Sequence, residues 1–163
     1  MKKFFLSLLV MASMCLSANA QFFVSGTLGL QYRSDVFSMK LVPGVGYELS
    51  DRLAIGVEGG FNLYDGDFQG LLNPYARFNF WNNEKLFLDG KAAAKLTFGD
   101  GYTGTFIGVL PSLRYAVNDK LQLAADIGFL GVDIEKYKHF KAEVNPAFGL
   151  KIYGVDLTVI YKF

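Results

Sequence analysis

The last eleven residues of the chain alternate strictly between apolar and mostly polar side chains. Every second position is apolar, at Tyr153, Val155, Leu157, Val159, Tyr161 and Phe163, while Gly154, Asp156, Thr158, Ile160 and Lys162 lie between them. A period of two is that of a β-strand with one apolar and one mostly polar face. Because aromatic residues lie at both ends of the apolar face, the segment is typical of a β-barrel wall in a lipid bilayer.

Seven further segments alternate in the same way, over residues 22–32, 39–48, 53–62, 72–80, 86–98, 107–115 and 121–129. No charged residue falls on the apolar face of any of the eight segments. Aromatic residues collect at one end of these faces (Phe22, Tyr47, Phe80, Tyr115, Tyr161 and Phe163) and at the other (Tyr32, Phe61, Phe98, Phe129 and Tyr153). Two aromatic belts indicate a bilayer with two interfaces. A soluble β-sandwich or lipocalin-like barrel is the alternative, since its strands also alternate.

An internal repeat supports the strand count. Short polar turns recur about 34 residues apart, at 50–53, 83–86 and 118–121, which is the length of one hairpin with its connections. Four hairpins predict an all-β fold, an eight-stranded antiparallel up-and-down transmembrane β-barrel. We expect the short turns to face the periplasm, and short outer loops near 33–38, 65–70, 99–104 and 133–143.

Two irregularities interrupt the pattern. Pro43, Pro74 and Pro111 lie within predicted strands, and because proline cannot donate to a β-ladder we expect them near the outer rim, at bulges or ragged pairing. Phe148 and Leu150 have even numbers, whereas the apolar face of the last strand is odd. This change of parity predicts a bulge between residues 149 and 154, or that 142–150 is still loop.

The first twenty residues have the pattern of a cleavable signal peptide. Lys2 and Lys3 precede an apolar stretch over 4–14, and the small residues Ala18-Asn19-Ala20 follow it. We expect cleavage after Ala20, a barrel domain over 21–163, and export to the bacterial outer membrane. A lipoprotein that begins at Cys15 is the alternative.

The expected mature chain has little net charge. Without Lys2 and Lys3, 14 of the 16 Lys and Arg residues remain against 15 Asp and Glu, which gives no reason to expect a nucleic-acid partner. The single cysteine lies within the first twenty residues, so no disulfide framework is expected.

The inward faces of the predicted strands have balanced charge. Five basic residues, Lys40, Arg77, Lys91, Lys95 and Arg114, match five acidic residues, Glu48, Glu58, Asp89, Asp126 and Asp156. An eight-stranded barrel is just wide enough for side chains to fill it, and an unpaired buried charge is costly. The balance therefore predicts a salt-bridge network that plugs the lumen. A narrow ion-conducting pore through the same residues is the alternative.

Candidate catalytic residues are few. The single histidine, His139, lies in the last expected outer loop, and Ser34 and Ser38 lie in the first, with Asp65 and Asp67 in the second. Such residues could form a Ser/His/Asp site that modifies lipid A or phospholipid. Because His139 lies in a basic, solvated segment over 136–141, we expect a non-enzymatic protein without a metal or cofactor.

The same segment suggests a lipid partner. Lys136, Lys138 and Lys141 lie just beyond the outer aromatic belt, where ammonium groups would pair with lipopolysaccharide phosphates.

The terminal Tyr161-Lys162-Phe163, the eight alternating segments and turns such as 49–53 resemble the small outer-membrane β-barrel family of OmpX and the OmpA transmembrane domain. The resemblance covers residues 21–163. It implies that Tyr161 and Phe163 form an assembly signal for the outer-membrane assembly machinery, and that the protein is a monomer with a structural or surface-interaction role. OmpX is associated with adhesion through long protruding strands, whereas the loops expected here are shorter.

Overall fold

The structure is a computed structural model that describes residues 21–33, 36–64, 66–99, 102–137, 143–150 and 154–163. The strands are β1 (Gln21–Arg33), β2 (Val36–Glu48), β3 (Leu53–Tyr64), β4 (Asp67–Asn83), β5 (Leu86–Gly99), β6 (Tyr102–Ala116), β7 (Leu121–Asp126), β8 (Gly128–Tyr137), β9 (Glu143–Leu150) and β10 (Gly154–Lys162). Among these described residues, no helix is long and apolar enough to cross a membrane.

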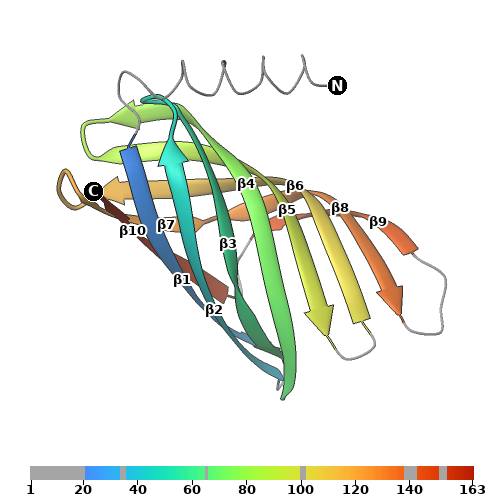
Figure 1. Cartoon of the computed structure of the whole chain (residues 1–163). Helices are drawn as coiled ribbons and strands as arrows, with labels where there is room; N and C mark the ends of the chain where they lie inside the picture. The colour runs from blue at the N-terminus through green and yellow to red at the C-terminus, as the bar shows by residue number, and fades with distance from the viewer. Residues whose placement is uncertain (1–20, 34–35, 65, 100–101, 138–142, 151–153) are drawn as a thin grey trace, which may run out of the picture.

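The strands close into a barrel of eight antiparallel walls. Consecutive strands pair from β1 to β6, β6 pairs with both β7 and β8, and β10 pairs with β7 on one side and β1 on the other (Figure 1). β7 and β8 are two parts of one wall, and β9 and β10 are two parts of another, because β8 pairs with β9 and β7 with β10. The predicted eight-stranded barrel is therefore confirmed.

Tight turns gather at one end of the barrel, which we call the turn end; we call the opposite end the far end. Backbone hydrogen bonds close two of these turns, from Leu49 N to Leu53 O at 2.8 Å and from Val117 N to Leu121 O at 2.9 Å. The side chains of Ser50 and Asn118 accept further hydrogen bonds from backbone amides two and three residues later. These side chains replace backbone acceptors in the turn, which explains the polar repeat in the sequence.

The outer surface of the barrel is apolar. Large apolar side chains from every wall are exposed there, including Leu28, Leu41, Val57, Leu113 and Leu157. A water-soluble protein rarely exposes a contiguous apolar surface of this extent. The alternation predicted from the sequence therefore produces a lipid-facing band, with Phe22, Phe80, Tyr115, Tyr161 and Phe163 exposed at the turn end.

A β-bulge separates β7 from β8 and reverses the faces of that wall. Ser112 pairs with Asp126, and Val109 pairs with Leu130, so that two residues of β6 oppose three residues of the neighbouring wall. One extra residue turns every later side chain to the other face. The prediction that Phe129 faces lipid was wrong, because Phe129 packs inside the barrel while the adjacent Leu130 is 65% exposed.

The bulge also explains why the apolar residues around Phe148 have even rather than odd numbers. In the register of β8 and β9, Leu130 is opposite Phe148 and Gly128 is opposite Leu150, so β9 follows the even numbering of the β8 outer face. The alternative that 142–150 is loop was wrong, because Glu143–Leu150 forms β9. The bulge predicted between residues 149 and 154 falls on a stretch of which 151–153 lie outside the described residues.

The strands extend farther than expected toward the far end. The expected loop near 33–38 falls mostly within β1 and β2, and Asp133, expected in a loop, lies within β8. The prolines lie in the middle of their strands rather than at a rim. Pro43 lies at a gap in the pairing of β2 with β3, and Pro74 lies at a gap in the pairing of β4 with β5. Pro111 is opposite the bulge, where its carbonyl accepts a hydrogen bond from Ile127 N at 2.9 Å. Ragged pairing was therefore predicted correctly, but its position was not.

Candidate functional site

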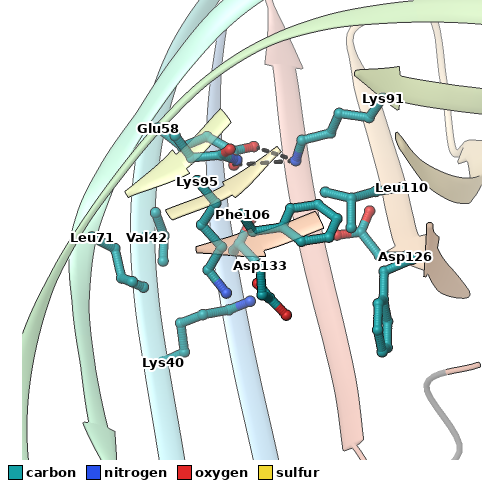
Figure 2. A pocket seen from close by; sticks show the side chains of 13 residues that line it. Lys40, Val42, Glu58, Leu71, Lys91, Lys95, Phe106, Leu110, Asp126 and Asp133 are labelled. Carbon is teal, nitrogen blue, oxygen red and sulfur yellow. Dashed lines mark hydrogen bonds and ion pairs between the residues drawn. The ribbon is translucent and has the colours of Figure 1, made fainter. Parts of the chain in front are cut away.

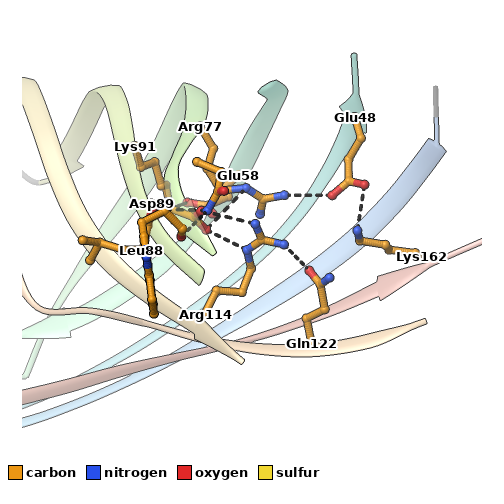
Figure 3. Close-up of polar contacts among 11 residues, drawn as sticks. Glu48, Glu58, Arg77, Leu88, Asp89, Lys91, Arg114, Gln122 and Lys162 are labelled. Atoms are coloured by element: carbon orange, nitrogen blue, oxygen red, sulfur yellow. Dashed lines mark hydrogen bonds and ion pairs between the residues drawn. The ribbon is translucent and has the colours of Figure 1, made fainter. Parts of the chain in front are cut away.

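A chain of polar contacts crosses the lumen near the turn end. Lys162 Nζ lies 2.7 Å from Glu48, Glu48 lies 3.2 Å from Arg77, and Arg77 lies 4.0 Å from Asp89. Arg114 Nε then lies 2.6 Å from Asp89, and Arg114 also donates to Gln122 Oε1 at 2.8 Å (Figure 3). These six residues, which we call the inner network, connect β10, β2, β4, β5, β6 and β7 across the barrel.

Asp89 is the most buried member of the inner network, with 1% of its surface exposed. Arg114 donates to both of its carboxylate oxygens, at 2.6 and 3.2 Å, and Asn79 Nδ2 donates to Oδ1 at 2.8 Å. A buried carboxylate is tolerated only where such partners offset its desolvation. Asp89 is therefore the carboxylate partner of Arg114 and a second, more distant carboxylate for Arg77, which also pairs with Glu48.

An apolar layer packs against the inner network. Its buried members are Phe23, Ala54, Tyr75, Ala93, Leu110 and Ile160. Arg77 lies over the Phe23 ring at 5.2 Å from the centroid, and Lys91 lies over the Tyr75 ring at 4.7 Å. Gly46 and Gly56 make room for these rings, because a Cβ at either glycine would collide with Phe23 or Tyr75.

The inner network and the apolar layer together fill the half of the lumen nearest the turn end. The cavity at this level measures only about 20 Å³ and lies among Ser25, Tyr75, Arg77, Ser112 and Thr158, among other residues. That is room for about one water molecule. We call the inner network and the apolar layer together the plug.

A larger cavity lies on the far side of the plug, and we call it the far-end cavity. Its volume is about 260 Å³ (Figure 2). Apolar walls come from Val42, Leu71, Phe106, Leu110 and Phe129, and charged groups come from Lys40, Glu58, Lys91, Lys95, Asp126 and Asp133. The lumen is thus filled near the turn end and hollow toward the far end.

Two ion pairs order the charged side of the far-end cavity. Lys91 Nζ donates to both Glu58 oxygens, at 2.8 and 3.1 Å, and Asn73 Nδ2 donates to Glu58 Oε2 at 2.7 Å. Lys40 Nζ lies 2.8 Å from Asp156. Gly29 leaves room for this second pair, since a Cβ there would collide with Asp156.

The ten charged residues expected in the lumen divide between these two regions. Glu48, Arg77, Asp89 and Arg114 lie in the inner network, Asp156 pairs with Lys40, and Lys40, Glu58, Lys91, Lys95 and Asp126 line the far-end cavity. Two further lumenal charges were not predicted from the sequence: Lys162 in the inner network and Asp133 at the far-end cavity. Lys162 was on the polar face of the last strand, which was a usable signal, whereas Asp133 depends on the parity change at the bulge.

The candidate catalytic residues are not brought together in the described part of the chain. Ser38 Oγ donates to Asn62 Oδ1 at 2.9 Å, while Ser34, Asp65 and His139 lie outside the described residues. Lys138 and Lys141 also lie outside them, and Lys136 lies in β8 without a described side chain. Within the described ranges, no group of three or more His, Cys, Asp or Glu residues could hold a metal ion.

The two chain ends of the barrel meet at the turn end. The Phe163 ring contacts those of Phe22 and Tyr161, with centroids 5.6 and 5.3 Å apart. Gln21 Nε2 donates to Phe163 O at 2.7 Å, and Phe163 N donates to Phe22 O at 3.1 Å. The aromatic rings of Tyr161 and Phe163 are thus exposed on the lipid-facing side of the barrel seam.

No protein-family model matches the chain, and no curated protein matches it in sequence. Among solved structures, neisserial surface protein A is similar over 90% of this chain and 98% of its own, with 13% identity and a TM-score of 0.54. A de novo designed transmembrane β-barrel is 16% identical over 88% of this chain and 95% of its own, with a TM-score of 0.46. An outer-membrane channel from Pseudomonas putida F1 is 12% identical over the same shares, with a TM-score of 0.34. The first likeness supports the fold, that of a small outer-membrane β-barrel.

Proposed function

We propose that this protein is a closed, non-conducting β-barrel of the bacterial outer membrane, with a structural or surface-interaction role and no enzymatic activity. The observation that carries the proposal is the plug. Its inner network links six strands around the lumen, from Lys162 on β10 to Gln122 on the neighbouring β7, and has the buried Phe23 and Ile160 behind it. The apolar outer surface supports residence in a membrane.

The energetics of the plug argue against a pore. An ion needs a continuous path of water or of polar ligands that release it again. Here the charged groups are already paired with each other, and removing one partner of a buried pair costs about 3–5 kcal/mol. An ion that displaced Arg114 from Asp89 would have to offset that cost at every passage.

Planar-bilayer recording tests the closed barrel. The purified, refolded protein is added to a bilayer in parallel with a wide porin as the positive control. We expect the porin to give steady current steps and this protein to leave the baseline unchanged. Steady unitary steps from this protein, at a frequency that rises with its concentration, would instead favour the narrow-pore alternative.

The non-enzymatic part of the proposal has its own test. Lipid A and phospholipids from cells with and without this protein are compared by mass spectrometry, and a His139→Ala variant serves as the matched control. We expect identical spectra from all three. A lipid A or phospholipid species that gains or loses an acyl chain only with the unsubstituted protein would revive a site at His139, Ser34 and Ser38.

Lipid contact and assembly complete the proposed role. Lys136, Lys138 and Lys141 would pair with lipopolysaccharide phosphates at the outer interface, and the exposed rings of Tyr161 and Phe163 would present the assembly signal. We expect a monomer, exported by its leader with cleavage after Ala20. Truncation of Phe163 should lower the amount of protein in outer-membrane fractions, while Phe98→Ala, at an exposed aromatic position elsewhere in the wall, should not.

A further inference from the structure

Among the described strands, the seam between β1 and β10 is the junction whose register is set by no turn. Every other junction joins walls that follow each other along the chain, and a connecting turn limits how far two such strands can slide. At the seam, Thr27 is paired with Thr158 although 131 residues separate them. Because the backbone ladder can form equally well after a slide of two residues, side chains have to select the register.

An ion pair crosses the seam over a glycine. Asp156 of β10, Gly29 of β1 and Lys40 of β2 are paired in one row, and Lys40 Nζ lies 2.8 Å from Asp156 Oδ2. The pair can pass directly over β1 because Gly29 has no side chain, and a Cβ there would collide with Asp156. This ion pair, which we call the far latch, therefore joins the last strand to the second strand.

A second ion pair joins the same two strands near the turn end, with the charges reversed. Lys162 Nζ lies 2.7 Å from Glu48 Oε2, and we call this pair the near latch (Figure 3). In the near latch β10 supplies the cation, whereas in the far latch it supplies the carboxylate. The four side chains are at most 18% exposed, so water screens both pairs less than it would at the surface.

A slide of β10 by two residues would break at least one latch in either direction. In one direction Asp156 comes opposite Thr27, in the row of Val42 rather than that of Lys40. In the other direction Lys162 comes opposite Ser25 instead of Phe23, and the strand rise of about 3.3 Å per residue moves it about 7 Å farther from Glu48. Only the observed register, of these three, forms both latches.

We infer that the far and near latches specify the register in which the last strand closes the barrel. One ion pair alone could form again after a slide, but two pairs of opposite sense exclude it, since one of them is always lost. Between the latches, the hydroxyl groups of Thr27 and Thr158 are hydrogen-bonded at 2.8 Å in the same register. This inference goes beyond the proposed structural role, because it concerns how the barrel closes rather than what the closed barrel does.

Disulfide crosslinks on the lipid-facing side of the seam can report the register. In the barrel domain over 21–163, which has no native cysteine, Leu28→Cys with Leu157→Cys reports the observed register, because these residues are directly opposite. Leu28→Cys with Val159→Cys, and Gly26→Cys with Leu157→Cys, report slides by two residues in the two directions. A disulfide usually needs Cα atoms about 4.4–6.8 Å apart, whereas diagonal neighbours are about 7–8 Å apart.

Charge inversion in the far latch is the test. Each cysteine pair is refolded into lipid vesicles and then oxidised; the folded fraction is measured by gel mobility without heating, and its crosslinks by mass spectrometry. With the latch intact we expect only the crosslink of the observed register. Asp156→Lys places two lysines together, so it should reduce the folded fraction and lower the ratio of observed-register to slid crosslinks at least about tenfold. Lys40→Asp combined with Asp156→Lys reverses the pair and should restore both.

Lys91→Glu is the matched control. Lys91 pairs with Glu58 at 2.8 Å across β4, away from the seam, so its inversion should reduce the folded fraction without producing slid crosslinks. If Asp156→Lys gave the same result as this control, the far latch would stabilise the barrel without selecting its register, and the inference would be wrong. Failure of the reversed pair to restore folding and register, or slid crosslinks from Lys91→Glu, would also overturn it. Should Asp156→Lys not fold at all, Asp156→Asn takes its place with the same deciding outcomes.

Discussion

Replacing Asp89 by asparagine should destabilise the barrel far more than the same change at an aspartate in an exposed turn. The substitution keeps the shape of the side chain and removes only the charge. Arg114 then loses the carboxylate that it contacts at 2.6 and 3.2 Å, and retains Gln122 at 2.8 Å. Arg77 loses the Asp89 carboxylate at 4.0 Å but keeps Glu48 at 3.2 Å.

The expected loss of stability comes mainly from Arg114, because Arg77 keeps its ion pair with Glu48. Removing one partner of a buried ion pair typically costs about 3–5 kcal/mol, because the remaining charge stays buried and unpaired. Asp89 is 1% exposed, and the side chain of Arg114 is also buried. Because the neutral amide of the Asp89→Asn variant can still accept a hydrogen bond from Arg114, we expect a loss at the lower end, about 3 kcal/mol.

Urea unfolding of the protein in lipid vesicles measures this loss. The single tryptophan, Trp81, is exposed on the lipid-facing side near the turn end, so its fluorescence should report departure from the bilayer. Asp119→Asn, in an exposed turn, is the control and should stay within about 0.5 kcal/mol of the unsubstituted protein. If Asp89→Asn also changed the free energy of unfolding by no more than about 0.5 kcal/mol, the idea that the inner network depends on the Asp89 charge would be refuted.

A double variant separates charge from packing. Asp89→Asn combined with Arg114→Met removes both partners of the shortest pair, and replacement of a buried pair by uncharged groups is often close to neutral. We therefore expect the double variant to be more stable than Asp89→Asn alone. Additive losses would mean that Arg114 stabilises the barrel through contacts other than its pairing with Asp89.

Three further changes test other parts of the structure by the same unfolding assay. Leu157→Arg places a charge on the lipid face, where Leu157 is 43% exposed, and should cost about 2–4 kcal/mol; stability like that of the unsubstituted protein would overturn the face assignment. Gly108→Val pushes the Phe106 ring from its place and should cost about 1–3 kcal/mol; no change would mean that the ring moves freely. Glu84→Gly relieves a positive φ of 34° and should stabilise by about 1 kcal/mol; a loss would point to a side-chain role for Glu84.

The barrel could be predicted from the sequence because membrane strands separate their two faces so strictly. Residues such as Leu157 and Thr158 differ in number by one and face lipid and lumen respectively. The polar turns at Ser50 and Asn118 then fix where each hairpin begins, since their side chains close the turns themselves. The alternation and the turn residues are both local features, so both can be recognised in the sequence without knowledge of the rest of the fold.

The faces beyond residue 126 could not be predicted from alternation alone. A bulge inserts one residue into one wall, and its position depends on the pairing with β6 rather than on any local motif. Pro111, which lies opposite this bulge, was visible in the sequence, but we expected it at the rim. The error moved Phe129 to the wrong face and left Asp133 in a loop.

The pairing of the lumenal charges was also beyond sequence reasoning. Alternation indicates which residues point inward, but partners on distant strands depend on the stagger of the whole barrel. Lys162 and Glu48 are 114 residues apart and meet only because the first and last walls close. The apolar layer around Phe23 and Ile160 was likewise missed, because the lumen was expected to be filled by polar groups alone.

The central claim is that the lumen is sealed toward the turn end and hollow toward the far end. Reaction of single cysteines with a charged, water-soluble methanethiosulfonate reagent tests it most directly, in the barrel domain over 21–163, which has no native cysteine. Phe129→Cys places a thiol in the far-end cavity, and Ala54→Cys places one in the apolar layer of the plug.

We expect the folded Phe129→Cys variant to react and the Ala54→Cys variant to react only after unfolding in urea, as read by mass spectrometry. This result would place water beside residue 129 and exclude it from the plug. Equal reaction of both thiols in the folded barrel would show a water-filled lumen, and an unreactive Phe129→Cys would show that this position faces lipid or a filled interior. Either result would contradict the account.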